Sequence, residues 1–327
     1  MKQATALDLK IRPFEGLDDV PAFARILNNE LKADGVPNFE TEGDIRAWMS
    51  HPTDTFRPDR DVNLAFVDGA PVAYSEREWV DTNDGVYREY RINGAVLPEW
   101  RRKGIGTALL EYNVERAREL AATQQTERQR VLGSWSNDRQ AGRIALLQKQ
   151  GFEPVRWFFE MTRDLSDPIP EVELPEGLEI RPVTDDNIFQ VWHADVEAFK
   201  DHWGGFDDSD ERLKSWMESP TFDPTLWVIA WDGDEVAAGN VNSISHEENA
   251  AIGVQRGWLN SVFTRRPWRK RGLANALIAR SLQLIKDRGM DYGVLGVDAE
   301  NPTGALGLYE RNGFKVLERS TAWRKPL

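Results

Sequence analysis

Apolar residues follow the spacing of a helix face in two segments of the chain. In both segments, successive members are separated by 4, 5 and 3 positions. An α-helix repeats every 3.6 residues, so each set lies along one side of a helix. The two sets are Ile105, Leu109, Val114 and Ala117, and Leu273, Leu277, Leu282 and Ile285. The pattern predicts two long amphipathic helices that each pack on a core through this side.

The residues around the second helix predict alternating strands and helices. Strands are expected at 178–182, 226–231, 235–245, 258–264, 292–298 and 314–321. Helices are expected at 185–203, 209–218, 273–288 and 302–312. The run Asp232-Gly233-Asp234 predicts a β-hairpin turn between two of these strands. The first half follows the same order, with hairpin strands at 64–67 and 71–78. Each half is therefore predicted to be an α/β (α+β) domain, a mixed central sheet flanked by helices.

Sequence features repeat between the two halves of the chain. The matched pairs are 9–13 with 178–182, 96–106 with 264–274, and Gly-Phe at 151–152 with Gly-Phe at 313–314. The first two pairs are offset by 169 and 168 positions. A repeat of this length predicts two tandem copies of one domain.

A stretch rich in proline and acidic residues separates the two copies. Pro168, Pro170 and Pro175 interrupt both helical and strand periodicity there. We therefore expect an N-terminal domain at 1–165, a linker at 166–177 and a C-terminal domain at 178–327. The total length of 327 residues suits two domains of ordinary size.

Composition excludes several classes of protein. The net charge of −13 disfavours nucleic acid as a partner, because phosphate contacts need a basic surface. The chain has no run of 18 apolar residues for a membrane span, and its start lacks the apolar core of a secretory signal. It has no cysteine, which excludes disulfides, thiolate metal sites and a cysteine nucleophile and agrees with a cytoplasmic location. The four histidines lack metal-ligand spacing, so no metal is expected.

An anion site is predicted where a strand turns into each amphipathic helix. Arg-x-x-Gly-x-Gly/Ala occupies both turns, at 101–106 and 269–274. The start of a helix directs unpaired backbone N–H groups and the positive end of the helix dipole toward an anion such as phosphate. Both turns lack the Gly-Lys-Ser/Thr of a Walker loop, and the second has only one of the glycines that a dinucleotide fingerprint needs. The structural alternative is a tight turn with solvated arginines.

A short helix with a tyrosine in its last turn follows the second anion site. Asn301 is predicted to cap its N-terminus, with Pro302 in the first helical position. Gly313 is placed for a left-handed C-terminal cap that ends the helix before Phe314. Tyr309 stands in the last turn of this helix.

We call the predicted anion sites at 101–106 and 269–274 the two phosphate cradles. A phosphate cradle followed by a tyrosine on a helix resembles the GNAT superfamily of N-acetyltransferases, which bind acetyl-CoA. The resemblance covers nearly the whole chain, in two copies. It implies that strand residues before each cradle pair with the pantetheine arm, that the cradle holds the pyrophosphate, and that Asn301 contacts CoA. The implied acetyl-CoA-binding residues are Val262, Phe263, Thr264, Arg269, Lys270, Arg271, Gly272, Leu273, Ala274 and Asn301 in the second copy, and Gly94, Ala95, Val96, Arg101, Arg102, Lys103, Gly104, Ile105 and Gly106 in the first.

The resemblance gives Tyr309 the role of catalytic acid. In GNAT enzymes a tyrosine at this place donates a proton to the departing CoA thiolate, and a tyrosine with an ordinary pKa of about 10 is protonated at neutral pH. The structural alternative is a core aromatic. In the first copy Leu147 stands at this place and cannot donate a proton, and Asn137 is two residues off the register of Asn301. We therefore expect the second domain to be catalytic and the first to keep only the cofactor cradle.

No single residue is indicated as the general base. Trp258 and Asn260 occupy the inward positions of the central strand, where many GNAT relatives carry a glutamate. Asp298, Glu247 and His246 lie on neighbouring segments and stay open as candidates.

The acceptor amine is expected at the helical cap of the second domain. By resemblance, the two helices after the first strand cover the groove opposite CoA. Asp201, His202 and Trp203 lie there and combine acidic and aromatic groups, which suits a polar amine. An ordinary helix end with a packed tryptophan is the structural alternative. The other candidates for the acceptor site are Asn240, Asn242 and the loop at 246–247.

The tandem arrangement is similar to that of the mycothiol synthase family, whose second domain acetylates the amine of a cysteine-containing pseudodisaccharide. The resemblance implies acetyl transfer from acetyl-CoA to a primary amine of a small molecule, by a monomer or homodimer without nucleic-acid or membrane partners. One alternative is acetylation of an aminoglycoside, a polyamine or a peptide amine. The other is a non-catalytic acyl-CoA-binding or regulatory protein.

Overall fold

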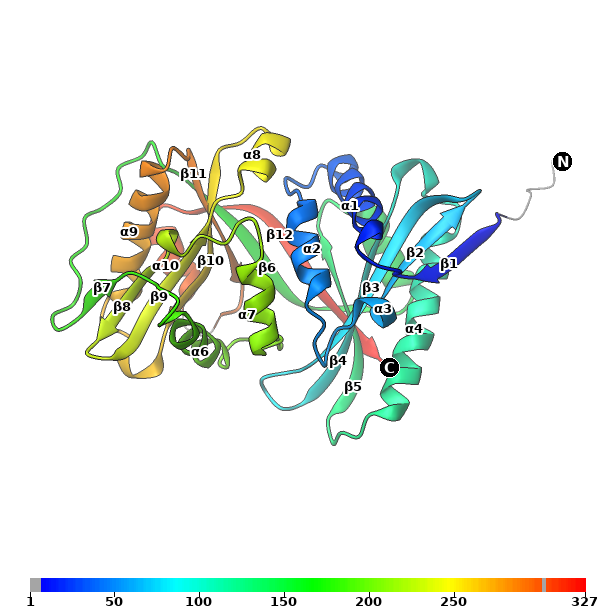
Figure 1. The fold of residues 1–327 in the computed structure, drawn as a ribbon, viewed down its shortest axis with the longest axis horizontal. Coiled ribbons are helices and arrows are strands. Elements are labelled where there is room, and N and C mark those ends of the chain that lie inside the picture. The colour runs from blue at the N-terminus through cyan, green and yellow to red at the C-terminus, as the bar shows by residue number, and fades with distance from the viewer. Residues whose placement is uncertain (1–6, 302–303) are drawn as a thin grey trace. The chain divides into compact units, whose positions relative to one another are not determined.

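The computed structural model describes residues 7–301 and 304–327 and divides the chain into two compact units (Figure 1). Unit 1 contains the chain through Val155 together with Ser209–Ser219 and Thr321–Leu327. Unit 2 contains Arg156–Asp208 and Pro220–Ser320. Each unit is a mixed sheet flanked by helices, which confirms the predicted fold class.

The sheet of unit 1 begins with antiparallel neighbours and then contains a parallel pair. Its order is β1-β2-β3-β4-β5, with β4 and β5 parallel and the end of β12 beside β5. The strands are β1 (Leu9–Pro13), β2 (Val62–Val67), β3 (Ala70–Asp81), β4 (Tyr87–Val96), β5 (Gln129–Asn137) and β12 (Lys315–Pro326). The helices are η1 (Leu17–Asp19), α1 (Val20–Asp34), α2 (Glu42–Ser50), α3 (Pro58–Asp61), η2 (Pro98–Trp100), α4 (Ile105–Thr123), α5 (Ala141–Lys149) and α7 (Asp210–Met217).

Successive residues of β3 face opposite sides of this sheet. Ala73 packs with Ile105 and Leu109 of α4, whereas Tyr74 packs with Phe23 of α1. The ring centroids of Phe23 and Tyr74 are 3.7 Å apart. The sheet is thus covered by α4 on one face and α1 on the other. All four predicted apolar positions of α4 are buried, which confirms the amphipathic helix.

The sheet of unit 2 follows the same pattern. Its order is β6-β11-β10-β9-β8-β7, with β10 and β11 parallel and β6 antiparallel to β11. The strands are β6 (Glu153–Asp164), β7 (Glu179–Arg181), β8 (Val228–Asp232), β9 (Glu235–Ser243), β10 (Arg256–Thr264) and β11 (Tyr292–Asp298). The helices are α6 (Ile188–Phe199), η3 (Pro224–Leu226), α8 (His246–Ile252), η4 (Arg266–Trp268), α9 (Leu273–Asp287) and α10 (Ala305–Arg311). The predicted hairpin is β8–β9, and the predicted apolar face of α9 is buried.

Most of β6, the last strand of the first half, lies in unit 2, and the end of β12, the last strand of the second half, lies in unit 1. Most of β6 pairs with β11, and Met161 of β6 is fully buried in the core cluster that contains α9. Trp323, near the end of β12, is buried in unit 1 and donates from Nε1 to the Ser136 hydroxyl at 2.8 Å. The compact units therefore differ from the expected limits at 165 and 178, because the alternating pattern of a strand does not specify which sheet it joins.

The segment at 209–219 belongs to unit 1, although it follows α6 of unit 2 along the chain. Its helix α7 packs on α2, where the Ser215 hydroxyl donates to the Ala47 carbonyl oxygen at 3.1 Å. Leu213 of α7 is fully buried. Of the two helices expected to cover the groove of the second domain, α6 packs on β9 and β10 of unit 2, whereas α7 lies in unit 1.

The helix α10 starts later than predicted. It begins at Ala305, and its N-cap residue is Gly304 with a φ of +77°, so Asn301 does not cap the helix. Pro302, expected in the first helical position, lies outside the described residues. At the other end Gly313 has a φ of +82°, which confirms the predicted left-handed cap.

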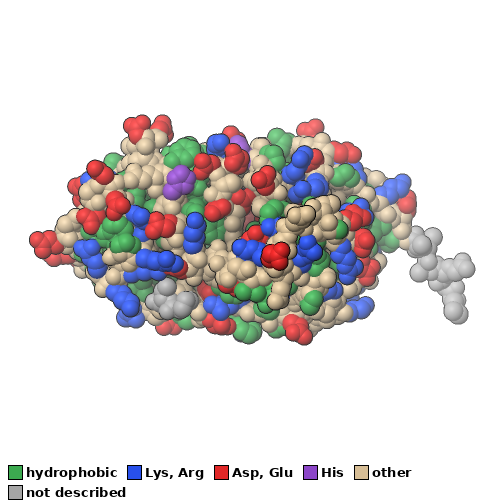
Figure 2. All heavy atoms as spheres, turned by 90° about the horizontal axis from the view of Figure 1, so that it is seen from below, with side chains coloured by type: hydrophobic (Ala, Val, Ile, Leu, Met, Phe, Trp, Pro, Cys, Tyr) green, Lys and Arg blue, Asp and Glu red, His purple; other side chains and the backbone are tan. Residues whose placement is uncertain are grey.

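No helix within residues 7–301 and 304–327 is long and apolar enough to cross a membrane. Basic and acidic side chains are interspersed over the face of the molecule shown in Figure 2. This face therefore differs from the basic stripe by which nucleic-acid-binding proteins attach to phosphates.

Candidate active site

Each sheet opens where its two parallel strands separate. In unit 2, β10 pairs with β11 as far as Leu259 among the described residues and continues beside β9 to Thr264. In unit 1, β4 pairs with β5 as far as Arg91 and continues beside β3 to Val96. The freed strand edge presents backbone N–H and C=O groups that an extended ligand can pair with. The segments implied to bind pantetheine lie on these freed strands, at 262–264 and 94–96.

The loop after each freed strand has the same backbone conformation in both units. A short 3-10 turn, η2 or η4, comes first. Arg102 and Gly104 then have φ angles of +60° and +88° before α4, and Lys270 and Gly272 have φ angles of +62° and +83° before α9. A φ near +85° is strained for any residue with a Cβ, which explains the glycine in each loop. Each loop leads into a helix N-terminus, the local structure expected for an anion site.

Arg269, the first residue of the second cradle, is bound within the protein. Its guanidinium donates to the Thr264 carbonyl oxygen at 2.9 Å and to the Asp201 carboxylate at 2.7 Å. Arg266 also binds Asp201, and these two arginines lower the pKa of the Asp201 carboxyl. The side chain of Arg269 thus links the strand, the loop and the residue that follows α6.

Arg101 makes the corresponding contacts in unit 1. It binds Asp34, the last residue of α1, through two bonds of 2.6 and 2.9 Å, and it donates to the Val96 carbonyl oxygen at 3.4 Å. The first arginine of each cradle therefore stabilises the loop. In unit 2 the next two residues, Lys270 and Arg271, are exposed and have no ion pair within 7–301 and 304–327.

Tyr309 lies in the last turn of α10 and is 6% exposed. Its ring packs in the core of unit 2, with its centroid 6.0 Å from that of Phe314 in a T-shaped contact. Burial raises the pKa of Tyr309 to about 12. The hydroxyl is therefore protonated over the physiological pH range and can act as a proton donor.

The residues expected to bind the acceptor differ in their surroundings. The Asp201 carboxylate is engaged by two arginines, which favours a role in supporting the cradle over the predicted role in acceptor binding. His202 stacks on Phe199 with ring centroids 4.2 Å apart, and burial lowers the pKa of His202. The ring of Trp203 lies 5.9 Å from that of Phe158. His202 and Trp203 thus remain aromatic surfaces beside α6.

The candidates for the general base either bind an arginine or lie in a helix where a loop was predicted. Asp298 receives two hydrogen bonds of 2.9 Å from the Arg156 guanidinium. His246 and Glu247 form the first turn of α8, where a loop was expected. The Asp298 carboxylate is therefore engaged by the Arg156 side chain.

The other polar residues named as candidates belong to hydrogen-bond networks. Asn240 and Asn242 are fully buried on β9, and both amides donate to the Ser281 hydroxyl of α9, at 3.1 and 3.0 Å. Trp258 donates from Nε1 to Glu248 of α8 at 3.0 Å. The two asparagines therefore contribute to the core between β9 and α9.

The sequence patterns did not indicate Asp195, which lies beside the freed part of β10. Asp195 is on α6 and accepts a hydrogen bond from the Ser261 hydroxyl at 2.5 Å. Burial raises the pKa of Asp195 to about 7, although the hydrogen bond from Ser261 opposes the shift. Asp195 is spaced from Val191 and Ala198 as members of one helix face are, so a carboxylate within an apolar stripe was the signal available in the sequence.

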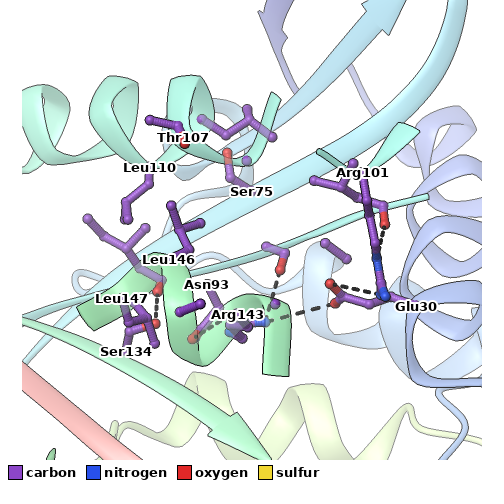
Figure 3. Close-up of a pocket in the computed structure, with 18 of the residues that line it drawn as sticks. Glu30, Ser75, Asn93, Arg101, Thr107, Leu110, Ser134, Arg143, Leu146 and Leu147 are labelled. Carbon is purple, nitrogen blue, oxygen red and sulfur yellow. Dashed lines mark hydrogen bonds and ion pairs between the residues drawn. The ribbon is translucent and has the colours of Figure 1, made fainter. Parts of the chain in front are cut away.

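A cavity of about 570 Å³ lies in unit 1, where β4 and β5 separate (Figure 3). Among the residues that line it are Gly94, Ala95, Val96, Arg101, Arg102, Gly104 and Gly106, all implied to bind the cofactor. Arg143 of α5, which the sequence did not single out, donates to the Gly94 carbonyl oxygen at 3.0 Å and to Asn93 at 3.2 Å, and it lies 4.0 Å from Glu30. The Arg143 guanidinium thus binds a backbone carbonyl oxygen on the edge of β4 that β5 leaves unpaired. Leu147 lines the same cavity.

The chain matches two family models and full-length relatives. Residues 190–314 match the acetyltransferase (GNAT) family, and residues 59–154 match an acetyltransferase (GNAT) domain. A mycothiol acetyltransferase of Geodermatophilus obscurus is 30% identical over 325 residues, covering 96% of this chain and 97% of that protein. A mycothiol acetyltransferase of Salinispora arenicola is 30% identical over 302 residues, covering 90% of this chain and 89% of that protein.

Solved structures share the fold. A GCN5-related N-acetyltransferase from Sphaerobacter thermophilus matches with a TM-score of 0.70 at 27% identity, over 98% of this chain and 97% of that chain. A tandem GNAT protein from the clavulanic acid biosynthesis pathway matches with a TM-score of 0.70 at 15% identity, over 98% of each chain. The second match is a likeness of fold.

Proposed function

Since this chain belongs to the GNAT acetyltransferase family and transfers an acetyl group from acetyl-CoA to an amine, we propose that unit 2 performs the transfer with Tyr309 as the proton donor. The acceptor that we propose is a primary amine of a small molecule. In this proposal unit 1 does not catalyse.

The observation that carries the assignment is the difference between Leu147 and Tyr309 at equivalent places. The backbone N–H of Phe152 bonds to the Leu147 carbonyl oxygen at 3.0 Å, and the backbone N–H of Phe314 bonds to the Tyr309 carbonyl oxygen at 3.1 Å. The two helices therefore end in the same way, with the same residue of the last turn facing the core. A hydroxyl is available at this place in unit 2 and is missing in unit 1.

The residues of unit 2 fit acetyl-CoA. The freed part of β10 from Val262 to Thr264 offers backbone groups to the pantetheine arm. The loop before α9 offers backbone N–H groups and the exposed Lys270 and Arg271 to the pyrophosphate. Acetyl-CoA bound there supplies the acetyl group as a thioester. Tyr309 holds the proton that the departing sulfur needs, because its buried hydroxyl is not ionised at neutral pH.

The proposed inactivity of unit 1 has two supports. Leu147 has no proton to donate, and Arg143 takes the Gly94 carbonyl oxygen that an extended ligand would pair with. The cradle from Arg101 to Gly106 nevertheless keeps the conformation of its counterpart. We infer that unit 1 is an acyl-CoA-binding copy without catalytic function.

We propose a mycothiol-type amine as the first candidate acceptor, because the relatives that match along the chain are mycothiol acetyltransferases. The other candidates are an aminoglycoside, a polyamine and a peptide amine. We infer a cytoplasmic enzyme, monomer or homodimer, without a nucleic-acid partner. The lack of cysteine and the net charge of −13 support this inference.

Release of CoA thiol from acetyl-CoA tests the proposal. The amines to compare are the unacetylated cysteinyl precursor of mycothiol, an aminoglycoside, a polyamine and a peptide N-terminus. Wild-type protein should release thiol in an amine-dependent manner, and Tyr309→Phe should lose most of this release while still binding acetyl-CoA. Equal turnover by wild type and Tyr309→Phe would overturn the assignment of the reaction to unit 2.

A further inference from the structure

The hydrogen bond between Asp195 and Ser261 lies where β10 leaves β11. Pairing of the two strands ends at Leu259 in the described chain, and the register of β10 with β9 shifts between Leu259 and Ser261. The Ser261 hydroxyl donates to Asp195 at 2.5 Å. The Asp195 carboxylate therefore lies beside the point at which the split in the sheet begins.

Different helices lie on the two faces of β10. Leu259 and Val262 pack in the core cluster that contains residues of α9. Ser261 instead reaches Asp195 of α6. Asp195 thus lies on the face of β10 opposite α9, near the point where β10 and β11 separate. β10 therefore lies between the Asp195 carboxylate and the apolar core that contains α9.

Neighbouring carboxylates of unit 2 are bound by arginine, whereas Asp195 is not. Asp298 of β11 binds Arg156 at 2.9 Å, and Glu248 of α8 binds Arg256 at 2.6 Å. Within 7–301 and 304–327, Asp195 has no ion pair, and its hydrogen-bond partner is a neutral hydroxyl. A buried carboxylate whose partner is neutral can take up a proton near neutral pH.

We propose that Asp195 is the general base that removes the proton from the acceptor amine, while Ser261 holds the carboxylate in place. This inference rests on the proposed function of unit 2. The amine nitrogen forms a bond to the acetyl carbon, and the carbon–sulfur bond breaks with its electron pair going to sulfur. The proton on nitrogen passes to Asp195, and the Tyr309 hydroxyl gives its proton to the sulfur. Asp195 then loses its proton to water and Tyr309 regains one, so atoms and charges balance.

The surroundings of Asp195 place its titration near neutral pH. α6 packs on β9 and β10, and β9 carries no ionisable side chain from Val236 to Ser243. The other ionisable residues of α6 and β10 are His193, Glu197 and Arg256. Glu197 pairs with Arg265 at 2.9 Å, and Arg256 pairs with Glu248. Burial therefore dominates and raises the pKa of Asp195 to about 7. Asp195 accepts a proton above this pH and is already protonated below it.

Asp195→Asn tests the proposal, because it keeps the shape and the acceptor for Ser261 but cannot take up a proton. With the amine that wild type acetylates fastest in the panel above, kcat should fall by about 10²–10⁴-fold. The Kd for acetyl-CoA, measured by calorimetry, should stay within about twofold, because Asp195 acts on the acceptor. Asp195→Glu should recover part of the lost activity. Glu197→Gln, on the same helix, is the matched control and should keep wild-type turnover.

The pH profile adds a readout that a structural role would not change. Wild-type kcat/KM should rise about tenfold per pH unit below pH 7 and become constant above it. Asp195→Asn should lose this pH-dependent rise. Unchanged kcat in Asp195→Asn together with a large loss in Tyr309→Phe would overturn the role of Asp195 and leave the proposed function standing. Unchanged kcat in both variants would overturn both. Weakened acetyl-CoA binding in Asp195→Asn and Asp195→Glu alike would make Asp195 structural and overturn the proposal.

Discussion

Arg269 binds Asp201 at 2.7 Å, and the same guanidinium donates to the Thr264 carbonyl oxygen at 2.9 Å. Asp201 follows α6 and Thr264 ends β10, so the Arg269 side chain links a helix, a strand and the loop before α9. Arg101 and Asp34 repeat the pair in unit 1. Arginine suits this place because its planar group presents several donors in a fixed geometry.

Asp201→Asn should therefore weaken acetyl-CoA binding and leave the KM of the acceptor unchanged. The pair is partly exposed and is expected to contribute ~1 kcal/mol, which corresponds to about a threefold to tenfold higher Kd. Calorimetric titration with acetyl-CoA measures this change. Asp34→Asn, the matched change in unit 1, should not alter binding to unit 2. A raised acceptor KM with unchanged acetyl-CoA affinity would return Asp201 to the acceptor site.

Tyr309→Phe should lower kcat by about 10²–10⁴-fold and leave the Kd for acetyl-CoA nearly unchanged, because only the proton donor is removed. Steady-state kinetics and calorimetry measure the two effects. Leu147→Ala, at the equivalent place, should leave turnover intact and lower the free energy of unfolding by about 2–5 kcal/mol through a cavity in unit 1. A similar loss of turnover in the two folded variants would contradict the division of roles between the units.

Arg143→Ala should strengthen acetyl-CoA binding to unit 1, because it frees the Gly94 carbonyl oxygen on the edge of β4. One additional hydrogen bond corresponds to about a tenfold lower Kd. The measurement needs Gly272→Glu as background, since added bulk and negative charge at that loop should abolish binding to unit 2. Gly104→Glu is the reciprocal control for unit 1. Unchanged affinity in Arg143→Ala would show that the guanidinium does not compete with the ligand.

Asp195→Asn should be more thermostable than wild type above neutral pH. The pKa of Asp195 is raised to about 7 in the folded chain, whereas an ordinary aspartate has a pKa of about 3.9. Between these values the folded state binds more protons than the unfolded state, so the wild type loses stability as the pH rises. The variant lacks this loss of stability. Between pH 5 and pH 8 its Tm should therefore rise relative to that of wild type, by about 2–4 °C for each kcal/mol of stability that wild type loses. A Tm difference that does not change with pH would contradict the raised pKa.

Local patterns of the sequence were sufficient for many elements of the fold. The apolar stripes predicted α4 and α9, the run Asp232-Gly233-Asp234 predicted the β8–β9 hairpin, and Gly313 predicted the end of α10. These features depend on periodicity and on the φ angles that each residue tolerates, both of which are local. The capping of α10 by Asn301 was wrong, because the left-handed Gly304 interrupts the segment just before the helix.

The sequence by itself determined the two GNAT copies, their glycine-containing loops before α4 and α9, and the presence of a tyrosine in one of them. Only the tertiary structure decided that β6 and the end of β12 exchange sheets, that Arg143 reaches across the cavity of unit 1, and that Asp195 meets Ser261. Each of these contacts joins residues whose relation depends on which surfaces pack together. No spacing along the chain encodes that choice, because the same strand or helix pattern can satisfy more than one partner.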